Sequence, residues 1–200
     1  MPSAPKIQKD TMLSVALQMV VDEGYQSVTI KTLAAKLGCS TAPISWQFGG
    51  MEGFRQELYD YACHYAEKKY YYNNGSQLAT FEQNGFGTVD MALYEPNLFR
   101  FLYLSEKIVG VWDGIFEVPG GAYGKQACQG LAQALGLTEK QAADFMVAMM
   151  LYAQGIAVTL VCGNMHPDKQ RVYAMIHQTG MVYLKGLGIT SEQLAKMFCP

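Results

Sequence analysis

The feature that most limits how this chain can fold is a glycine between two short helical patterns within residues 28–54, VTIKTLAAKLGCSTAPISWQFGGMEGF. Apolar residues recur at helical spacing before Gly38, and a glycine at the end of such a pattern favours the left-handed conformation that ends a helix. After it, Ser40 is predicted to cap a second helix, in which Ile44 and Phe48 share one buried face. The turn between the helices has about three residues, so the stretch predicts a helix-turn-helix.

The second helix of this motif is predicted to present its exposed face to DNA. Two helices joined by so short a turn cross steeply, so the face opposite the buried residues projects outward and suits the major groove. The residues predicted to contact DNA here are Ser40, Thr41, Ala42, Pro43, Ser45, Trp46 and Gln47. Gln47 suits adenine and Thr41 suits a base or the backbone, whereas Lys31 and Lys36 are expected only to position the protein on phosphates.

The order G-C-S-T-A-P-I-S-W-Q-F-x-x-M-E-x-F from Gly38 to Phe54 resembles the DNA-binding signature of tetracycline-repressor (TetR) family regulators. The preceding segments are similar too, since family members begin with an amphipathic helix ending in Glu-Gly-Tyr, here residues 22–25, and a Thr-Val/Ile step, here residues 28–30. The resemblance covers about the first 60 residues. It implies a dimeric regulator, usually a repressor, that binds a pseudo-palindromic double-stranded DNA operator and a small-molecule effector.

Two departures from the family pattern motivate an alternative function. Ser45 and Met51 stand where a Tyr and a Lys are usual, and both usual residues commonly contact phosphates in the family. Residues 1–60 carry five Lys and Arg against six Asp and Glu, although no acidic residue lies between Glu23 and Glu52, so the predicted DNA face is weakly cationic. The alternative is a helical ligand-binding or interaction protein of the same fold, with lost or weak DNA binding.

The composition favours a regulatory protein with a partner subunit. Hydrophobic residues make up 50% of the chain and charged residues 16%, which favours a homodimer that covers apolar surface. A net charge of −2 argues against general coating of nucleic acid and against attraction to a membrane surface, so DNA contact should be local. The polar N-terminus and five scattered cysteines are typical of a cytoplasmic protein.

The remaining patterns predict an all-α protein with two domains. We expect a three-helix, helix-turn-helix DNA-binding domain at residues 1–50 and a larger helical effector-binding and dimerisation domain at residues 51–200. The predicted helices besides the motif are residues 5–22, about 50–70, one or two within 77–95, 96 to about 109, 126–135, 139 to about 162, 172–187 and 190–198. A glycine-rich loop over residues 110–124 is expected to form a pocket wall or entrance.

The helix around residues 145–161 is apolar except for Gln154 and Thr159. It is shorter than the roughly 20 residues that a membrane span needs, so we interpret it as a buried helix and expect no membrane partner. Because it is apolar nearly all round, this helix and the one at residues 172–187 are predicted to form a four-helix dimer interface with their copies.

The effector is expected to be apolar or aromatic, because methionine and aromatic side chains adapt to such ligands. The candidate ligand-binding residues are Phe99, Phe101, Tyr103, Trp112, Phe116 and Tyr152, and filling of the core is the alternative role for each.

No catalytic, cofactor or metal site is expected. The chain lacks Gly-x-Ser-x-Gly, a phosphate-binding glycine loop and His-Glu-x-x-His, so enzyme activity is not predicted. Cys162 and His166 lack the second ligand pair that structural zinc requires. Thiol sensing by Cys39, Cys63 or Cys128 stays open beside a simple packing role.

Overall fold

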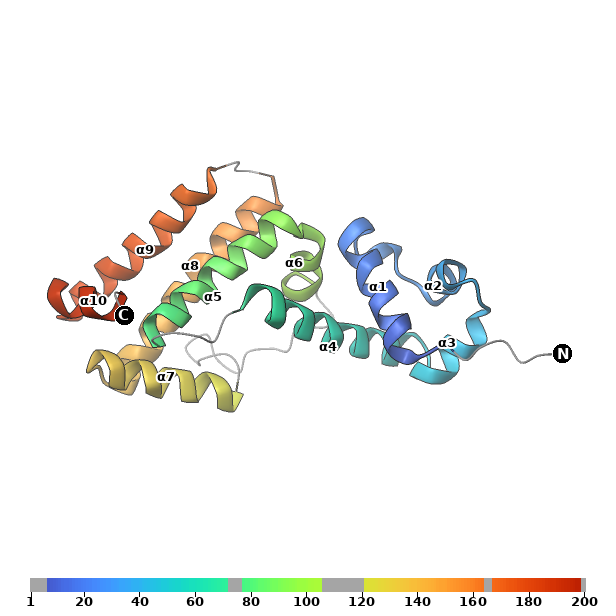
Figure 1. Ribbon diagram of the computed structural model, residues 1–200, viewed down its shortest axis with the longest axis horizontal. Coiled ribbons are helices and arrows are strands. Elements are labelled where there is room, and N and C mark those ends of the chain that lie inside the picture. Colours follow the sequence, from blue (N-terminus) through green and yellow to red (C-terminus); the bar gives the residue numbers. More distant parts are fainter. Residues whose placement is uncertain (1–6, 72–76, 106–120, 164–166, 199–200) are drawn as a thin grey trace. The chain divides into compact units, whose positions relative to one another are not determined.

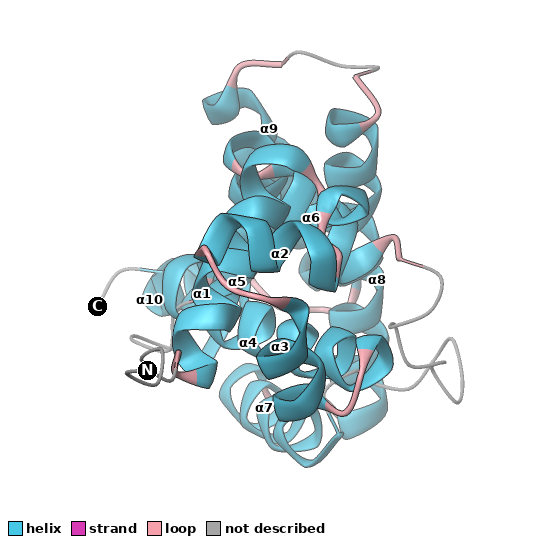
Figure 2. Cartoon of the chain, turned by 90° about the vertical axis from the view of Figure 1, so that its right-hand side faces the viewer, coloured by secondary structure: helices cyan, strands magenta, loops and turns pink. Residues whose placement is uncertain are grey.

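The computed structural model describes residues 7–71, 77–105, 121–163 and 167–198, which form ten α-helices, one short 3-10 helix and no strand (Figures 1 and 2). The predicted all-α class is therefore confirmed. Internal contacts divide the chain into two compact units. The head unit comprises residues 1–69 and 94–109, and the body unit comprises residues 70–93 and 110–200.

The head unit contains α1 (Lys9–Glu23), the 3-10 helix η1 (Tyr25–Ser27), α2 (Ile30–Leu37), α3 (Thr41–Phe48), α4 (Met51–Tyr70, except its last residue) and α6 (Pro96–Tyr103). The predicted start of the first helix at residue 5 is wrong. Gln8 has an extended backbone, with φ −71° and ψ 149°, and the helix begins at the next residue.

The predicted helix-turn-helix is formed by α2 and α3. Gly38 ends α2 in the left-handed conformation at φ 65°, as predicted. Thr29 and Thr32 form a capping box at the start of α2, in which the backbone N–H of each residue donates to the hydroxyl of the other. The predicted capping role of Ser40 is wrong, because its backbone is extended as in an N-cap but its side chain makes no capping hydrogen bond. Ser40 is exposed, so water can satisfy the first amides of α3.

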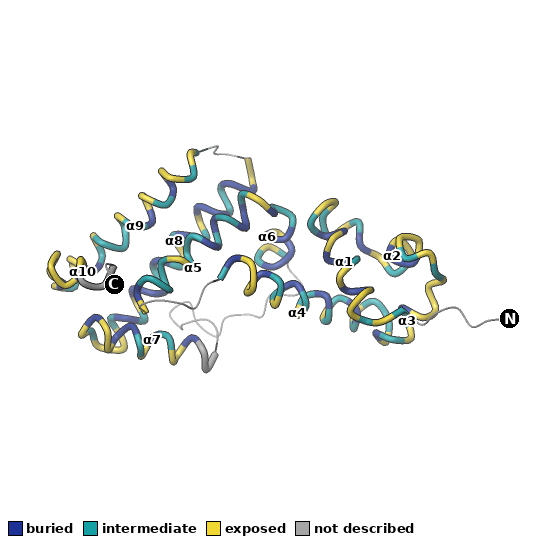
Figure 3. The backbone as a smooth tube through the Cα atoms, viewed as in Figure 1, coloured by how far each residue is buried: buried dark blue, intermediate teal, exposed yellow. Residues whose placement is uncertain are grey.

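The core of the head unit lies where α1 to α4 turn their apolar faces inward (Figure 3). Ile44 and Phe48 of α3 are both buried, and the ring of Phe48 meets the ring of Phe54 edge-on with centroids 5.1 Å apart. Large side chains of α1 to α4 that are buried almost completely are Met12, Leu33, Ile44, Phe54 and Leu58. These residues fix α3 from its inner face and leave its outer face to solvent.

Helix α6 is part of the head unit although it follows α5 in the chain. Asn97 donates from Nδ2 to the carbonyl oxygen of Val21 at the end of α1, at 3.1 Å. The Phe101 ring stacks on Tyr25 at 4.7 Å between centroids and meets Tyr59 of α4 edge-on at 6.1 Å. The helix ends at Tyr103, because Leu104 leaves helical geometry, so the predicted end near residue 109 is wrong.

The body unit contains α5 (Gln77–Tyr94, the last residue excepted), α7 (Gly121–Leu135), α8 (Glu139–Val161), α9 (Lys169–Gly186) and α10 (Ser191–Phe198). Helix α7 begins at Gly121, so the part of the predicted loop at residues 121–124 is helical instead. The rest of that loop, with Trp112 and Phe116, lies outside the described residues. Thr138 and Gln141 form a capping box at the start of α8.

Helices α5 and α9 are joined by three contacts spaced one turn apart along each helix. Glu82 pairs with His177 Nδ1 at 2.5 Å, and Phe86 stacks on Tyr173 with centroids 4.1 Å apart. Asp90 pairs with Lys169 Nζ at 2.9 Å, and the hydrogen bond to this carboxylate raises the pKa of Lys169. The antiparallel order of these pairs fixes the register of α9 on α5.

Helix α8 packs against both α7 and α9 in the body unit. Phe145 of α8 contacts the rings of Phe81 and Tyr183, each with centroids 5.5 Å away. Within the described residues, α8 alone is long and apolar enough to cross a membrane by length and composition, and half of its most apolar window is buried inside the protein. The core helix of a soluble protein meets the same criterion, which agrees with the interpretation of α8 as a core helix.

Candidate nucleic-acid interface

The outward face of α3 is short, exposed and without charge. Thr41, Ala42 and Pro43 are exposed, Ser45 and Gln47 are half-buried, and the indole-bearing Trp46 is 78% exposed. The prediction that Ile44 and Phe48 form the inner face is confirmed by their burial. Contact of the outer face with DNA stays a prediction.

The position of α3 on α4 is set by a close backbone contact. A Cβ atom on Gly53 would lie 2.0 Å from the carbonyl oxygen of Phe48, the last residue of α3. Only glycine therefore allows α4 to start so close to the end of α3. Gly49 and Gly50, at φ 68° and 103°, form the turn between the two helices.

The amide of Gln47 is partly used inside the protein. Its Nε2 donates to the carbonyl oxygen of Ile7 at 3.2 Å, which ties the segment before α1 to α3. The second N–H and the Oε1 atom of this amide have no hydrogen-bond partner within the described part of the chain. Those two groups are the donor and acceptor that a bidentate contact with adenine requires.

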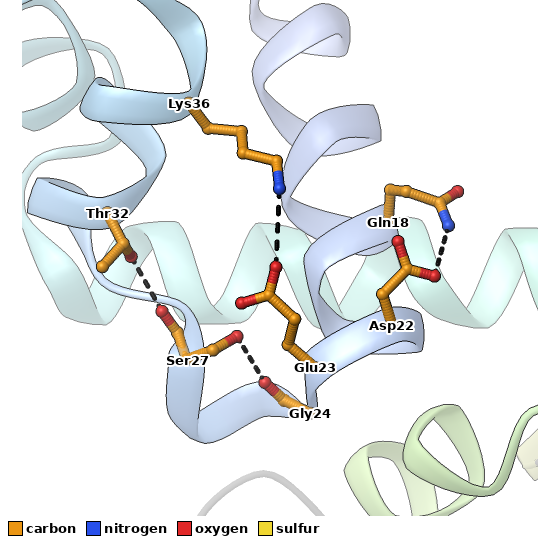
Figure 4. Close-up of polar contacts among 7 residues, drawn as sticks. All are labelled: Gln18, Asp22, Glu23, Gly24, Ser27, Thr32 and Lys36. Atoms are coloured by element: carbon orange, nitrogen blue, oxygen red, sulfur yellow. Dashed lines mark hydrogen bonds and ion pairs between the residues drawn. The ribbon is translucent and has the colours of Figure 1, made fainter.

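The segment between α1 and α2 is fixed by hydrogen bonds to main-chain oxygens (Figure 4). Ser27 donates from Oγ to the carbonyl oxygen of Gly24 at 2.7 Å, and Thr32 donates from Oγ1 to that of Ser27 at 2.8 Å. The start of α2 is thereby held against the end of α1, which places Lys31 and Lys36 relative to α3.

Most cations of the described residues 7–58 are paired with carboxylates. Lys36 Nζ lies 3.4 Å from Glu23 Oε1 (Figure 4), and Lys9 pairs with Glu57 of α4. Arg55 lies 3.4 Å from Glu52, and its Nε donates to the Tyr25 hydroxyl at 2.7 Å, which raises the pKa of the guanidinium. Lys31 is exposed and has no ion pair of this kind. The electrostatic attraction of this surface for phosphates is therefore weak.

Four of the six predicted effector-binding residues lie on two helices, and the other two, Trp112 and Phe116, lie outside the described residues. Phe99, Phe101 and Tyr103 lie on α6 of the head unit, and Tyr152 lies half-buried on α8 of the body unit. Phe99 and Phe101 are almost completely buried, and Phe101 packs against Tyr25 and Tyr59 as described above. Their role in effector binding stays a prediction.

Two of the described cysteines, Cys63 and Cys128, have the environment of packing residues rather than of reactive thiols. Burial raises the pKa of Cys63 and also that of Cys128. Cys39 is half-buried and Cys162 is exposed. No group of three His, Cys, Asp or Glu side chains that could hold a metal ion occurs in the described ranges.

Three residues that position the interface were missed by sequence reasoning: Gly53, Asn97 and Arg55. Asn97 has its partner 76 residues earlier in the chain, and Arg55 has its partner 30 residues earlier, so no local pattern indicates either contact. Gly53, a glycine within the first turn of a predicted helix, was the one available signal, since an isolated glycine in a helical pattern lowers helix propensity.

Comparison with known proteins identifies the domain that contains this surface. Residues 12–58 match a family model described as bacterial regulatory proteins, tetR family. The matched segment runs from α1 to the first turns of α4 and includes all of α3. No curated protein matches the chain.

Proposed function

We propose that this chain, which belongs to the tetR family of bacterial regulatory proteins through residues 12–58, is a homodimeric repressor released from a pseudo-palindromic operator by an apolar or aromatic effector. The tetR family domain makes the chain a DNA-binding transcriptional regulator, and members of this family are regulators rather than enzymes. The observation that carries the proposal is that α3 has an exposed outer face while its inner-face residues Ile44 and Phe48 are buried. The cytoplasm is the proposed location, where the DNA lies.

The proposed dimer is supported by an apolar stripe on two helices of the body unit. Leu151 of α8 is 44% exposed, and Met175 and Val182 of α9 are 40% and 71% exposed. Gly155 of α8 and Gly186 of α9 have no atom within 4 Å of an added Cβ position, so close approach of another helix is sterically open there. Exposed apolar surface of this kind is typical of a subunit interface.

The proposed regulation is supported by the way in which the chain connects the two units. The chain passes between the units after residues 69, 93 and 109, and the first two of these points lie at the ends of α4 and α5. A dimer binds one duplex with both heads only if its recognition helices lie roughly 34–36 Å apart. An effector that binds better to a body conformation with another spacing must therefore weaken DNA binding, and DNA must weaken effector binding by the same factor.

The proposed effector-binding residues are the aromatic residues named above, namely Phe99, Phe101, Tyr103, Trp112, Phe116 and Tyr152. The head-unit members on α6 pack against α1 and α4, so a ligand that displaced one of them would disturb the head directly. The support is chemical, because planar apolar ligands suit aromatic surroundings.

A second function is favoured by the paired cations. Three of the four Lys and Arg residues within the described residues 7–58 form ion pairs with Glu57, Glu23 and Glu52. A head unit in which most positive charges are paired with carboxylates is also compatible with an interaction protein that binds DNA weakly. The two functions differ in whether the protein selects a DNA sequence.

Selection of bound duplexes from a random pool tests the proposal. We expect enrichment of a palindrome whose half-site centres lie one helical turn apart, and one dimer bound per duplex in sedimentation. Absence of any enriched sequence would favour the interaction protein. Candidate effectors are then titrated into the protein with and without the selected duplex, and identical affinity in both titrations would contradict regulation by that ligand.

A further inference from the structure

We infer that α3 reads an A·T-rich half-site mainly through thymine methyl groups, with Trp46 as the principal contact. This inference rests on the proposed function, because it requires α3 to enter the major groove. It goes further by naming the base pairs that the outer face of α3 can recognise.

The chemistry of the face excludes the usual contacts with G·C pairs. Guanine is commonly read by Arg or Lys at O6 and N7, and cytosine by Asp or Glu at N4. Helix α3, with the sequence TAPISWQF, contains none of these four residue types. Lys31 and Lys36 belong to α2, and Lys36 is paired with Glu23. Lys9 of α1 lies over the ring of Phe48 on the inner face of α3 and is paired with Glu57.

The groups that α3 does expose match A·T pairs. Apolar carbon is what recognises the C5-methyl group of thymine, and Ala42 and Trp46 present it one helical turn apart on the exposed face. Trp46 is 78% exposed, so most of the surface of this residue faces solvent. Exposed Pro43 adds further apolar surface beside them.

Gln47 adds the one amide on this helix. Its hydrogen bond to Ile7 uses one N–H and fixes the orientation of the side chain. The remaining N–H and Oε1 can meet N7 and N6–H of adenine, the partner base of thymine. The amide and the indole therefore both favour A·T pairs, the amide through adenine and the indole through thymine.

This chemistry also selects DNA over RNA. Uracil lacks the C5-methyl group, and the major groove of an A-form duplex is too deep and narrow for a helix. The partner is consequently B-form DNA with thymines under α3.

The inference is tested on the duplex selected above by replacing single thymines with deoxyuridine, which removes only the methyl group. We expect deoxyuridine at each contacted thymine position to weaken binding about 4-fold, because the loss of one buried methyl group costs about 0.8 kcal/mol. Replacements outside the half-sites should have no effect. The Trp46→Ala variant should bind more weakly and should lose the deoxyuridine effect at its own thymine, while Trp46→Phe should keep part of it.

The Lys31→Ala variant is the matched control, because it should weaken binding to thymine and deoxyuridine duplexes equally. Circular dichroism and thermal melting establish that Trp46→Ala folds, as expected for so exposed a side chain. An enriched palindrome that is G·C-rich under α3, or binding that ignores deoxyuridine, would overturn this inference and leave the proposed function standing. No enriched palindrome at all would overturn both.

Discussion

Gly53 lies against the carbonyl oxygen of Phe48, so close that an added Cβ atom would be 2.0 Å from that oxygen. This close approach joins the last residue of α3 to the first turn of α4. Helix α3 carries the proposed DNA-contacting face. The orientation of this face therefore depends on residue 53 having no Cβ atom.

We predict that Gly53→Ala displaces α3. The new methyl group meets a backbone oxygen that cannot rotate away, so overpacking should lower the free energy of unfolding by about 1–3 kcal/mol. DNA affinity should fall by roughly 10-fold or more, since a recognition helix tolerates little displacement in the groove. Urea unfolding and DNA titration measure the two effects.

Gly85→Ala is the matched control for this variant. An added Cβ at Gly85 of α5 would lie 3.8 Å from Ile176 Cγ2, which is an ordinary contact. Helix propensity alone then applies, and we expect the free energy of unfolding to rise by about 0.5–1 kcal/mol with unchanged DNA affinity. If Gly53→Ala kept wild-type stability and DNA affinity, the prediction would be contradicted, because α4 would then be able to shift without moving α3.

The two glycines of the helix-turn-helix show what the sequence could and could not predict. Gly38 was predicted as the cap of α2, because its signal is local: an apolar pattern stops and a glycine follows. Gly53 was missed, because its role depends on an oxygen across the turn, a distance that no residue pattern encodes. For the same reason, the pairing of Asn97 with Val21 could not be foreseen.

Capping by Ser40 was predicted from a local signal, a hydroxyl residue directly before a helical pattern, and it is wrong. A hydroxyl before a helix permits a cap, but the rotamer decides whether it forms, and an exposed serine loses little by pointing to water. At Thr29 and at Thr138 the cap is reinforced by a second hydrogen bond. The backbone N–H of the capping residue donates to the side chain of Thr32 in the first case and of Gln141 in the second.

The helices of the body unit could be predicted from the sequence, but the way they pack against one another could not. Helical periodicity and caps predicted α8 and α9 within a few residues of their observed bounds. The pairing of Glu82, Phe86 and Asp90 with α9 was not predicted, because each pair joins residues about 80 to 95 positions apart. Single sequences carry no signal for such pairs.

Glu23 pairs with Lys36, and we expect this ion pair to lower the affinity of the head unit for DNA. We predict that Glu23→Gln raises DNA affinity about 2- to 5-fold, because an exposed ion pair is worth at most about 1 kcal/mol and Lys36 then becomes able to bind a phosphate. The dependence of log Kd on log salt should steepen by up to about 0.9 for each additional phosphate that the protein neutralises. DNA titrations at several salt concentrations measure both quantities.

Asp22→Asn separates release of Lys36 from loss of a negative charge. Asp22 is the neighbouring acid, accepts a hydrogen bond from Gln18 at 2.8 Å and has no ion pair with Lys36 (Figure 4). We expect a smaller rise in DNA affinity than that of Glu23→Gln. The double variant Glu23→Gln, Lys36→Ala should show no such rise, and an equal rise in Asp22→Asn would attribute the effect to net charge alone.

The described thiols should react in the order of their exposure and pKa. Burial raises the pKa of Cys63 and Cys128, so at pH 8 each holds less thiolate than an ordinary cysteine, and the thiolate is the reactive form. Cys162 is exposed and should be labelled first. Peptide mapping after brief alkylation measures the order at pH 8, and the labelling of Cys63 should rise further as the pH increases. Fast labelling of Cys63 at pH 8 would instead support thiol sensing.

The last prediction concerns the dimer and uses Val182, the most exposed apolar side chain on the proposed interface at 71%. Val182→Glu places a charge where two copies of α9 are proposed to meet, and burying an unpaired carboxylate costs several kcal/mol. We expect sedimentation to show monomers at micromolar concentration. DNA affinity should fall steeply, because one head alone makes half of the contacts. Gln170→Glu adds the same charge on a different side of α9, in its first turn, and should leave the dimer intact. A stable dimer in Val182→Glu would move the interface away from this stripe, and the apolar exposure of Leu151 and Met175 would then require another partner.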